Sequence, residues 1–111
     1  MTRVLVGEFH PMVAVGLHHL FAGEGWAVVN DRRGLTAAVI RDVRPDAVVV
    51  DLDDHHATSA AERLAGDFPS LPIVECSSSM PRLRVFPAPR SEPSRDLPLT
   101  LDLLLRAVNG S

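Results

Sequence analysis

The stretch that decides the fold is Ala47-Val48-Val49-Val50, followed directly by the polar run Asp51-Leu52-Asp53-Asp54-His55-His56. Four consecutive small or β-branched apolar residues, with no polar residue between them, indicate a strand buried on both faces. Such strands occupy the centre of a parallel sheet. The carboxyl ends of parallel strands carry the ligand sites of open α/β sheets. Residues 51–56 are therefore the first candidates for function.

Strand-like and helix-like patterns alternate along the rest of the chain. Short β-branched runs indicate strands, whereas apolar residues recurring every three or four positions indicate amphipathic helices. The predicted strands cover residues 4–6, 26–29, 47–50, 72–76 and 83–86, and the predicted helices cover residues 11–21, 35–43, 59–68 and 101–108. This alternation predicts an α/β fold with a doubly wound parallel sheet of five strands, covered by helices on both faces.

Local signals refine this prediction. Ser59 followed by Glu62 is a capping-box pattern, which predicts the start of a helix. Pro81 and Pro87 flank the fifth strand, which therefore suits only the edge of a sheet. Residues 87–98 contain four prolines, and this composition is typical of an extended connector.

Composition excludes several classes of function. The 111 residues predict one domain, 1–111, with a net charge of −3. All eleven cationic residues are arginine, so the chain has no lysine for a Schiff base or a P-loop. A net acidic chain does not favour direct nucleic-acid binding, and the short apolar runs predict no membrane span. Cys76 is the single cysteine, which favours a cytoplasmic location.

Three segments carry a resemblance to the receiver domains of response regulators in two-component signalling. They are Arg3-Val4-Leu5-Val6-Gly7-Glu8-Phe9-His10-Pro11-Met12-Val13, Arg44-Pro45-Asp46-Ala47-Val48-Val49-Val50-Asp51-Leu52, and Leu71-Pro72-Ile73-Val74 with Ser77 after it. The resemblance covers about residues 3–77. It implies a flavodoxin-like parallel sheet with strand order 2-1-3-4-5.

The resemblance also implies a set of site residues. Asp51 stands at the position of the phosphoacceptor. Glu8, Asp51 and the backbone carbonyl of Asp53 stand where the family holds Mg²⁺, a hard cation that prefers oxygen ligands. Ser77 stands at the position of the hydroxyl that turns toward the phosphoryl oxygens.

The chain departs from the family at two of these positions. Phe9 replaces an acidic metal ligand, and Ala88 falls where the family has a lysine. The short spacing from Ser77 to Ala88 implies that the fourth helix is shortened or missing. The resemblance therefore implies a degenerate, stand-alone pseudo-receiver in which Asp51 is a poor or silent phosphoacceptor. We expect no resident cofactor, with Mg²⁺ as the remaining alternative.

Two classes of function stay open. The first is a pseudo-receiver in a phosphorelay, without catalysis, that contacts a histidine kinase, an output protein or a second copy of itself. The expected contact surface is residues 78–98 with the last helix. The second is a metal- or small-ligand-binding domain that uses the same sheet edge, where His10, His55 and His56 lie beside carboxylates. Exposed loop histidines without a ligand are the simpler interpretation of that cluster.

Overall fold

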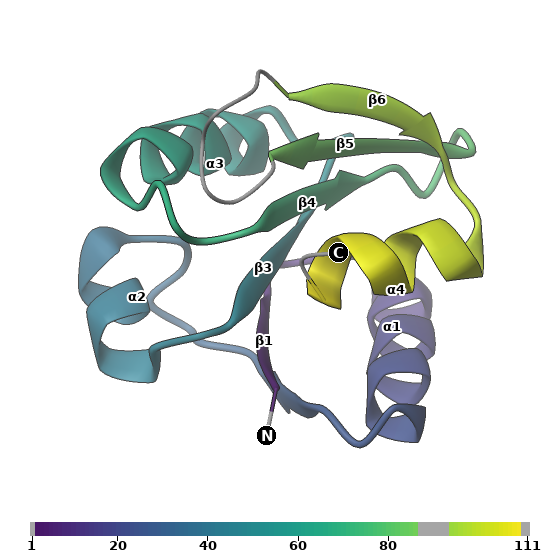
Figure 1. Cartoon of the computed structure of the whole chain (residues 1–111), viewed down its shortest axis with the longest axis horizontal. Helices are drawn as coiled ribbons and strands as arrows, with labels where there is room; N and C mark the ends of the chain where they lie inside the picture. Colours follow the sequence, from purple (N-terminus) through teal and green to yellow (C-terminus); the bar gives the residue numbers. More distant parts are fainter. Residues whose placement is uncertain (1, 87–93, 110–111) are drawn as a thin grey trace.

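The alternating pattern forms six strands and four helices in a computed structural model that describes residues 2–86 and 94–109 (Figure 1). The elements follow the chain as β1 (Arg3–Val6), α1 (Pro11–Gly23), β2 (Ala27–Val29), α2 (Ala37–Val43), β3 (Ala47–Asp51), α3 (His55–Asp67), β4 (Ile73–Cys76), β5 (Arg82–Phe86), β6 (Arg95–Pro98) and α4 (Leu101–Asn109). Among the described residues, no helix is both long and apolar enough to cross a membrane.

The strands form one mixed sheet in the order β2-β1-β3-β4-β5-β6. The pairs β2–β1, β1–β3 and β3–β4 are parallel, whereas β4–β5 and β5–β6 are antiparallel. The predicted α/β class is confirmed, but the prediction of a purely parallel sheet of five strands was wrong. Residues 77–81 separate β4 from β5 and form no helix. Because a parallel connection needs a crossover of about a dozen residues, this short segment forces an antiparallel return.

The predicted connector contains a strand. Residues 95–98 form β6, which pairs with β5 so that Leu97 lies opposite Leu83. The prediction that β5 lies at the edge was therefore also wrong, because β6 takes that place. Pro98 is the last residue of this edge strand, a position that tolerates a missing N–H. The rest of the connector, residues 87–93 with Ala88, lies outside the described residues.

The core has two layers, one on each face of the sheet. Helices α1 and α4 cover one face and α2 and α3 cover the other (Figure 1). Successive side chains of β3 point to opposite faces of the sheet, so this strand contributes to both layers. Ala47 and Val49 pack toward α1 and α4. Val48 and Val50 pack toward α2 and α3. All four residues are fully buried, as the sequence of β3 predicted.

Local sequence signals mark the end of α2, which precedes β3, and the start of α3, which follows it. Helix α2 ends at Val43, because Arg44 adopts a left-handed conformation with φ of 50° and Pro45 follows. Helix α3 begins at His55, four residues before the predicted start at Ser59. Asp54 caps it, since its side chain accepts hydrogen bonds from the first turn, and this cap prevails over the later capping-box pattern.

Candidate functional site

Asp51 is the last residue of β3 and is half-buried. One oxygen of its carboxylate, Oδ1, accepts a hydrogen bond of 2.9 Å from the backbone N–H of Asp53. This is an Asx-turn, in which a side chain replaces a backbone acceptor two residues earlier in the chain. The carboxylate of Asp51 therefore helps to shape the loop that connects β3 to α3.

The carboxylate of Asp53 is the centre of a hydrogen-bonded cluster. Ser77 Oγ donates to its two oxygens at 2.8 and 3.0 Å. The backbone N–H groups of Ser78 and Ser79 donate to Oδ2 at 3.1 and 3.2 Å. The hydrogen bond from Ser77, with those from Ser79 and Ser78, holds the pKa of this exposed carboxyl below its ordinary value. Residues 77–79 thus form an anion-binding loop that already holds an anion from the same chain.

The hydroxyl of Ser77 is used as both a donor and an acceptor. It donates to Asp53 and accepts from the backbone N–H of Met80 at 3.0 Å. The residue is 5% exposed, so these bonds fix a buried group. The structure therefore places the predicted switch hydroxyl against Asp53.

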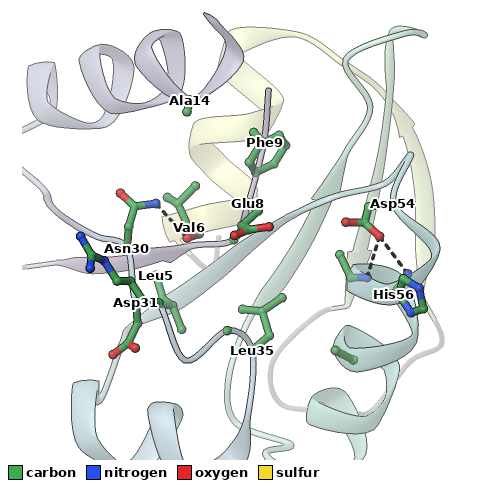
Figure 2. Close-up of a pocket in the computed structure, with 15 residues that line it drawn as sticks. Leu5, Val6, Glu8, Phe9, Ala14, Asn30, Asp31, Leu35, Asp54 and His56 are labelled. Carbon is green, nitrogen blue, oxygen red and sulfur yellow. Dashed lines mark hydrogen bonds between the residues drawn. The ribbon is translucent and has the colours of Figure 1, made fainter. Parts of the chain in front are cut away.

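A pocket of about 510 Å³ lies at the carboxyl ends of β1 and β2, beside the first turns of α3 (Figure 2). Apolar side chains form much of its wall, among them Leu5 and Leu35. Figure 2 shows the carboxylates of Glu8 and Asp54 facing one another across it. Asn30 also lines the pocket, and its Nδ2 donates a hydrogen bond to the carbonyl of Val6 at 3.1 Å. Glu8, the first predicted metal ligand, is therefore an exposed group on the rim of this pocket.

The predicted Mg²⁺ site has two side-chain ligands, Glu8 and Asp51, with the backbone carbonyl of Asp53 as the third. In the described ranges, no group of three His, Cys, Asp or Glu side chains is placed to hold a metal ion. The side chain of Asp53, whose backbone carbonyl is the predicted ligand, accepts hydrogen bonds from the serine loop, and Phe9 packs against the core layer under α1 and α4. A phenyl ring in that position supplies no ligand, so Glu8 and Asp51 are the carboxylates that remain of the predicted donor set.

The histidines are likewise dispersed. His10 caps α1, because its Nδ1 accepts from the backbone N–H of Met12 at 3.3 Å. His55 and His56 both begin α3 but line different pockets. The predicted cluster of histidines and carboxylates therefore does not form a common ligand set among the described residues.

A second pocket, of about 340 Å³, lies beside the serine loop and contains two arginines. Its lining residues are Leu52, Asp53, His55, Thr58, Ser77, Met80, Arg82 and Arg84. Both arginines pair with Asp96 of β6, through contacts of 3.8 Å from Arg82 Nη2 and 3.2 Å from Arg84 Nε.

Sequence reasoning missed Glu75, which lies inside β4 and is fully buried. Neither oxygen of its carboxylate has a hydrogen-bond partner among the described residues. Burial raises the pKa of Glu75 to about 7. The available signal was the sequence Ile73-Val74-Glu75-Cys76, in which a charged residue interrupts a strand predicted to be buried. The neighbouring thiol of Cys76 is also buried, and burial raises its pKa to about 12.

No protein-family model matches the sequence, and no curated protein matches it. The resemblance to receiver domains therefore rests on the sequence segments quoted above.

Proposed function

We propose that the chain is a receiver-like signalling module with an α/β fold that acts through contacts with other proteins and not through phosphorylation of Asp51. The observation that carries this proposal is the cluster of Asp53 with Ser77, Ser78 and Ser79. In the family that the sequence resembles, the hydroxyl at the position of Ser77 turns toward a phosphoryl group. Here the carboxylate of Asp53 takes the place of that anion, so the serine loop needs no phosphoryl group to be ordered.

The charges around Asp51 support the same proposal. Phosphoryl transfer to a carboxylate brings anions together, and metal ions or fixed cations must offset the repulsion. Phe9 removes one metal ligand, and the chain has no lysine. Arg82 and Arg84 line the pocket beside the serine loop, and both are engaged by Asp96. Losing such groups costs about 10²- to 10³-fold in rate for each group.

The proposed contact surface includes Met80 and Leu101, which are 55% and 65% exposed. A hydrogen bond of 2.9 Å from the N–H of Leu99 to the carbonyl of Pro81 joins the segments that carry them. Two large apolar side chains are thereby held on adjacent segments at the surface. Apolar side chains exposed on adjacent segments are typical of protein contact sites, and a kinase, an output protein or a second copy of the chain are the partners we propose.

Intact mass spectrometry after incubation with acetyl phosphate and Mg²⁺ tests the proposal. We expect the wild-type mass to stay unchanged, and Asp51→Ala to behave identically. A stoichiometric gain of about 80 Da, the mass of one phosphoryl group, that is present in wild type and lost in Asp51→Ala would overturn it.

A second candidate function is the binding of a small molecule in the 510 Å³ pocket. The pocket favours this alternative because it is large enough for a small ligand, has apolar walls, and lies at the carboxyl ends of the strands beside the switch between β1 and β3. The facing carboxylates of Glu8 and Asp54 favour ligands that carry an amine.

Amide NMR spectra recorded with a panel of small arylalkylamines, which are cationic at neutral pH, test this alternative. Binding predicts saturable shifts at Gly7, Leu35 and Ala57, with Kd below about 1 mM, that Glu8→Gln weakens. Matched aromatic carboxylic acids serve as the control. Spectra that do not change with any member of the panel would contradict the alternative.

A further inference from the structure

Three charged residues lie in a row across β4, β5 and β6. Glu75 is directly opposite Arg84 in the antiparallel pair β4–β5, and Arg84 is directly opposite Asp96 in β5–β6. Exposure increases along the row, since Glu75 is fully buried while the side chains of Arg84 and Asp96 are 31% and 60% exposed. The row therefore leads from the core to the solvent-exposed edge of the sheet.

The charges in this row are unevenly paired. Asp96 is contacted by two arginines, Arg84 at 3.2 Å and Arg82 at 3.8 Å. Glu75 has no hydrogen-bond partner among the described residues. The groups that act on Glu75 are Arg84 on β5, Glu62 on α3 and Asp96 on β6, whereas its neighbour on β3 is the apolar Val50. Arg84 is therefore the cation that lies opposite Glu75, but its guanidinium pairs with Asp96.

We propose that this row is a proton-linked latch. Arg84 stays with Asp96 while Glu75 is protonated, and it turns to pair with Glu75 once that carboxyl loses its proton, which leaves Arg82 to hold Asp96.

The free-energy cost of burying an unpaired charge drives this exchange of partners. An ionised carboxylate without a partner in the core is strongly unfavourable, whereas one paired with a guanidinium is tolerated. Arginine keeps its charge at all accessible pH values, so only the carboxyl changes state. Residues directly opposite on neighbouring strands have Cβ atoms about 5 Å apart, so Arg84 reaches Glu75 by side-chain rotation alone. Because burial raises the pKa of Glu75 to about 7, the exchange falls near neutral pH.

The exchange changes two features of the surface. Arg84 lines the 340 Å³ pocket beside Asp53 and Ser77, so its inward rotation removes a positive charge from that pocket. It also removes one of the two arginine contacts that tie β6 to β5 through Asp96. The latch thus makes the edge strand and the pocket respond to protons, whether or not the module is a receiver.

Heteronuclear NMR over about pH 5 to 9 tests the latch, with the side-chain signals Glu75 Cδ, Arg84 Nε and Asp96 Cγ followed together. We expect all three to shift with one common midpoint. Glu75→Gln should abolish that midpoint in the signals of Arg84 and Asp96. Glu62→Gln is the matched control, because it removes a nearby carboxylate but keeps the row, so the three signals should still move together.

Two results would overturn the proposal. One is a Glu75 signal that titrates below about pH 5, as an ordinary exposed carboxyl does. The other is an Arg84 or Asp96 signal that does not change while Glu75 titrates. Both are read from the wild-type protein, so the test does not depend on the folding of any variant.

Discussion

The hydroxyl of Ser77 donates to both carboxylate oxygens of Asp53, at 2.8 and 3.0 Å, and joins two residues that are 24 positions apart in the sequence. This contact connects the end of β4 to the loop after β3. Both segments lie at the edge of the sheet where α/β proteins place their sites. The carboxylate that accepts these bonds belongs to the chain itself, which is why we propose a module that works without phosphorylation.

Removing the hydroxyl of Ser77 should destabilise the fold. Ser77→Ala takes a donor from Asp53 and leaves the backbone N–H of Met80 without its acceptor. We expect the free energy of unfolding to fall by about 1 to 2 kcal/mol, measured by urea denaturation. Ser78→Ala is the control, because its exposed hydroxyl contacts Asp53 at only 3.3 Å, and it should cost less than about 0.5 kcal/mol. Equal losses in the two variants would contradict the special role of Ser77.

Stability should depend on the protonation of Glu75. Its pKa in the fold is about 7 against an ordinary value of 4.5, so the folded state holds a proton that the unfolded state has lost between these values. The free energy of unfolding should therefore fall as pH rises from about 4.5 to 7, by at most about 3 kcal/mol, and then level off.

Glu75→Met provides the matched comparison for this pH dependence. The substitution removes the buried carboxyl while keeping a similar volume, so the decline between these pH values should disappear. Methionine should also raise stability at about pH 8 by roughly 1 to 3 kcal/mol. Chemical denaturation at several pH values measures both effects, and an unchanged slope in the variant would show that another group is responsible.

Replacing Arg44 with glycine should relieve the strain of its left-handed backbone conformation. A side chain at φ of 50° is strained, whereas glycine adopts this conformation freely and is the usual residue at the end of a helix. Arg44→Gly should raise the melting temperature, with a gain of about 0.5 to 1 kcal/mol. Arg44→Ala keeps the strain and should give no gain. A glycine variant less stable than wild type would indicate that the arginine side chain makes a compensating contact.

The sequence predicted the parallel half of the molecule well, because that half depends on local patterns. The apolar run at residues 47–50 predicted a buried strand, and the helix predicted over residues 35–43 ends at Val43, as α2 does. Asp51 and Ser77 were placed correctly at the carboxyl edge of the sheet for the same reason, since each follows a predicted strand directly.

The antiparallel half was not predicted, because its structure depends on pairing. Residues 95–98 carry a single central apolar side chain, Leu97, and four prolines lie in the surrounding connector. Only the presence of β5 beside them makes these residues a strand. The contact of Asp53 with Ser77 and the row through Glu75 are also tertiary. Spacing in the sequence gave no indication that Ser77 would face Asp53, or that Arg84 would lie between two carboxylates.

The most direct test of the central claim is the amide NMR spectrum of Ser78 and Ser79, recorded before and after addition of acetyl phosphate and Mg²⁺. Their N–H groups donate to Asp53. We predict that both resonances stay unchanged in the wild type on that addition, and that Asp53→Asn alone shifts them strongly, because a neutral amide replaces the anion. Resonances of Ser78 and Ser79 that move in the wild type when acetyl phosphate is added, or that ignore Asp53→Asn, would contradict it.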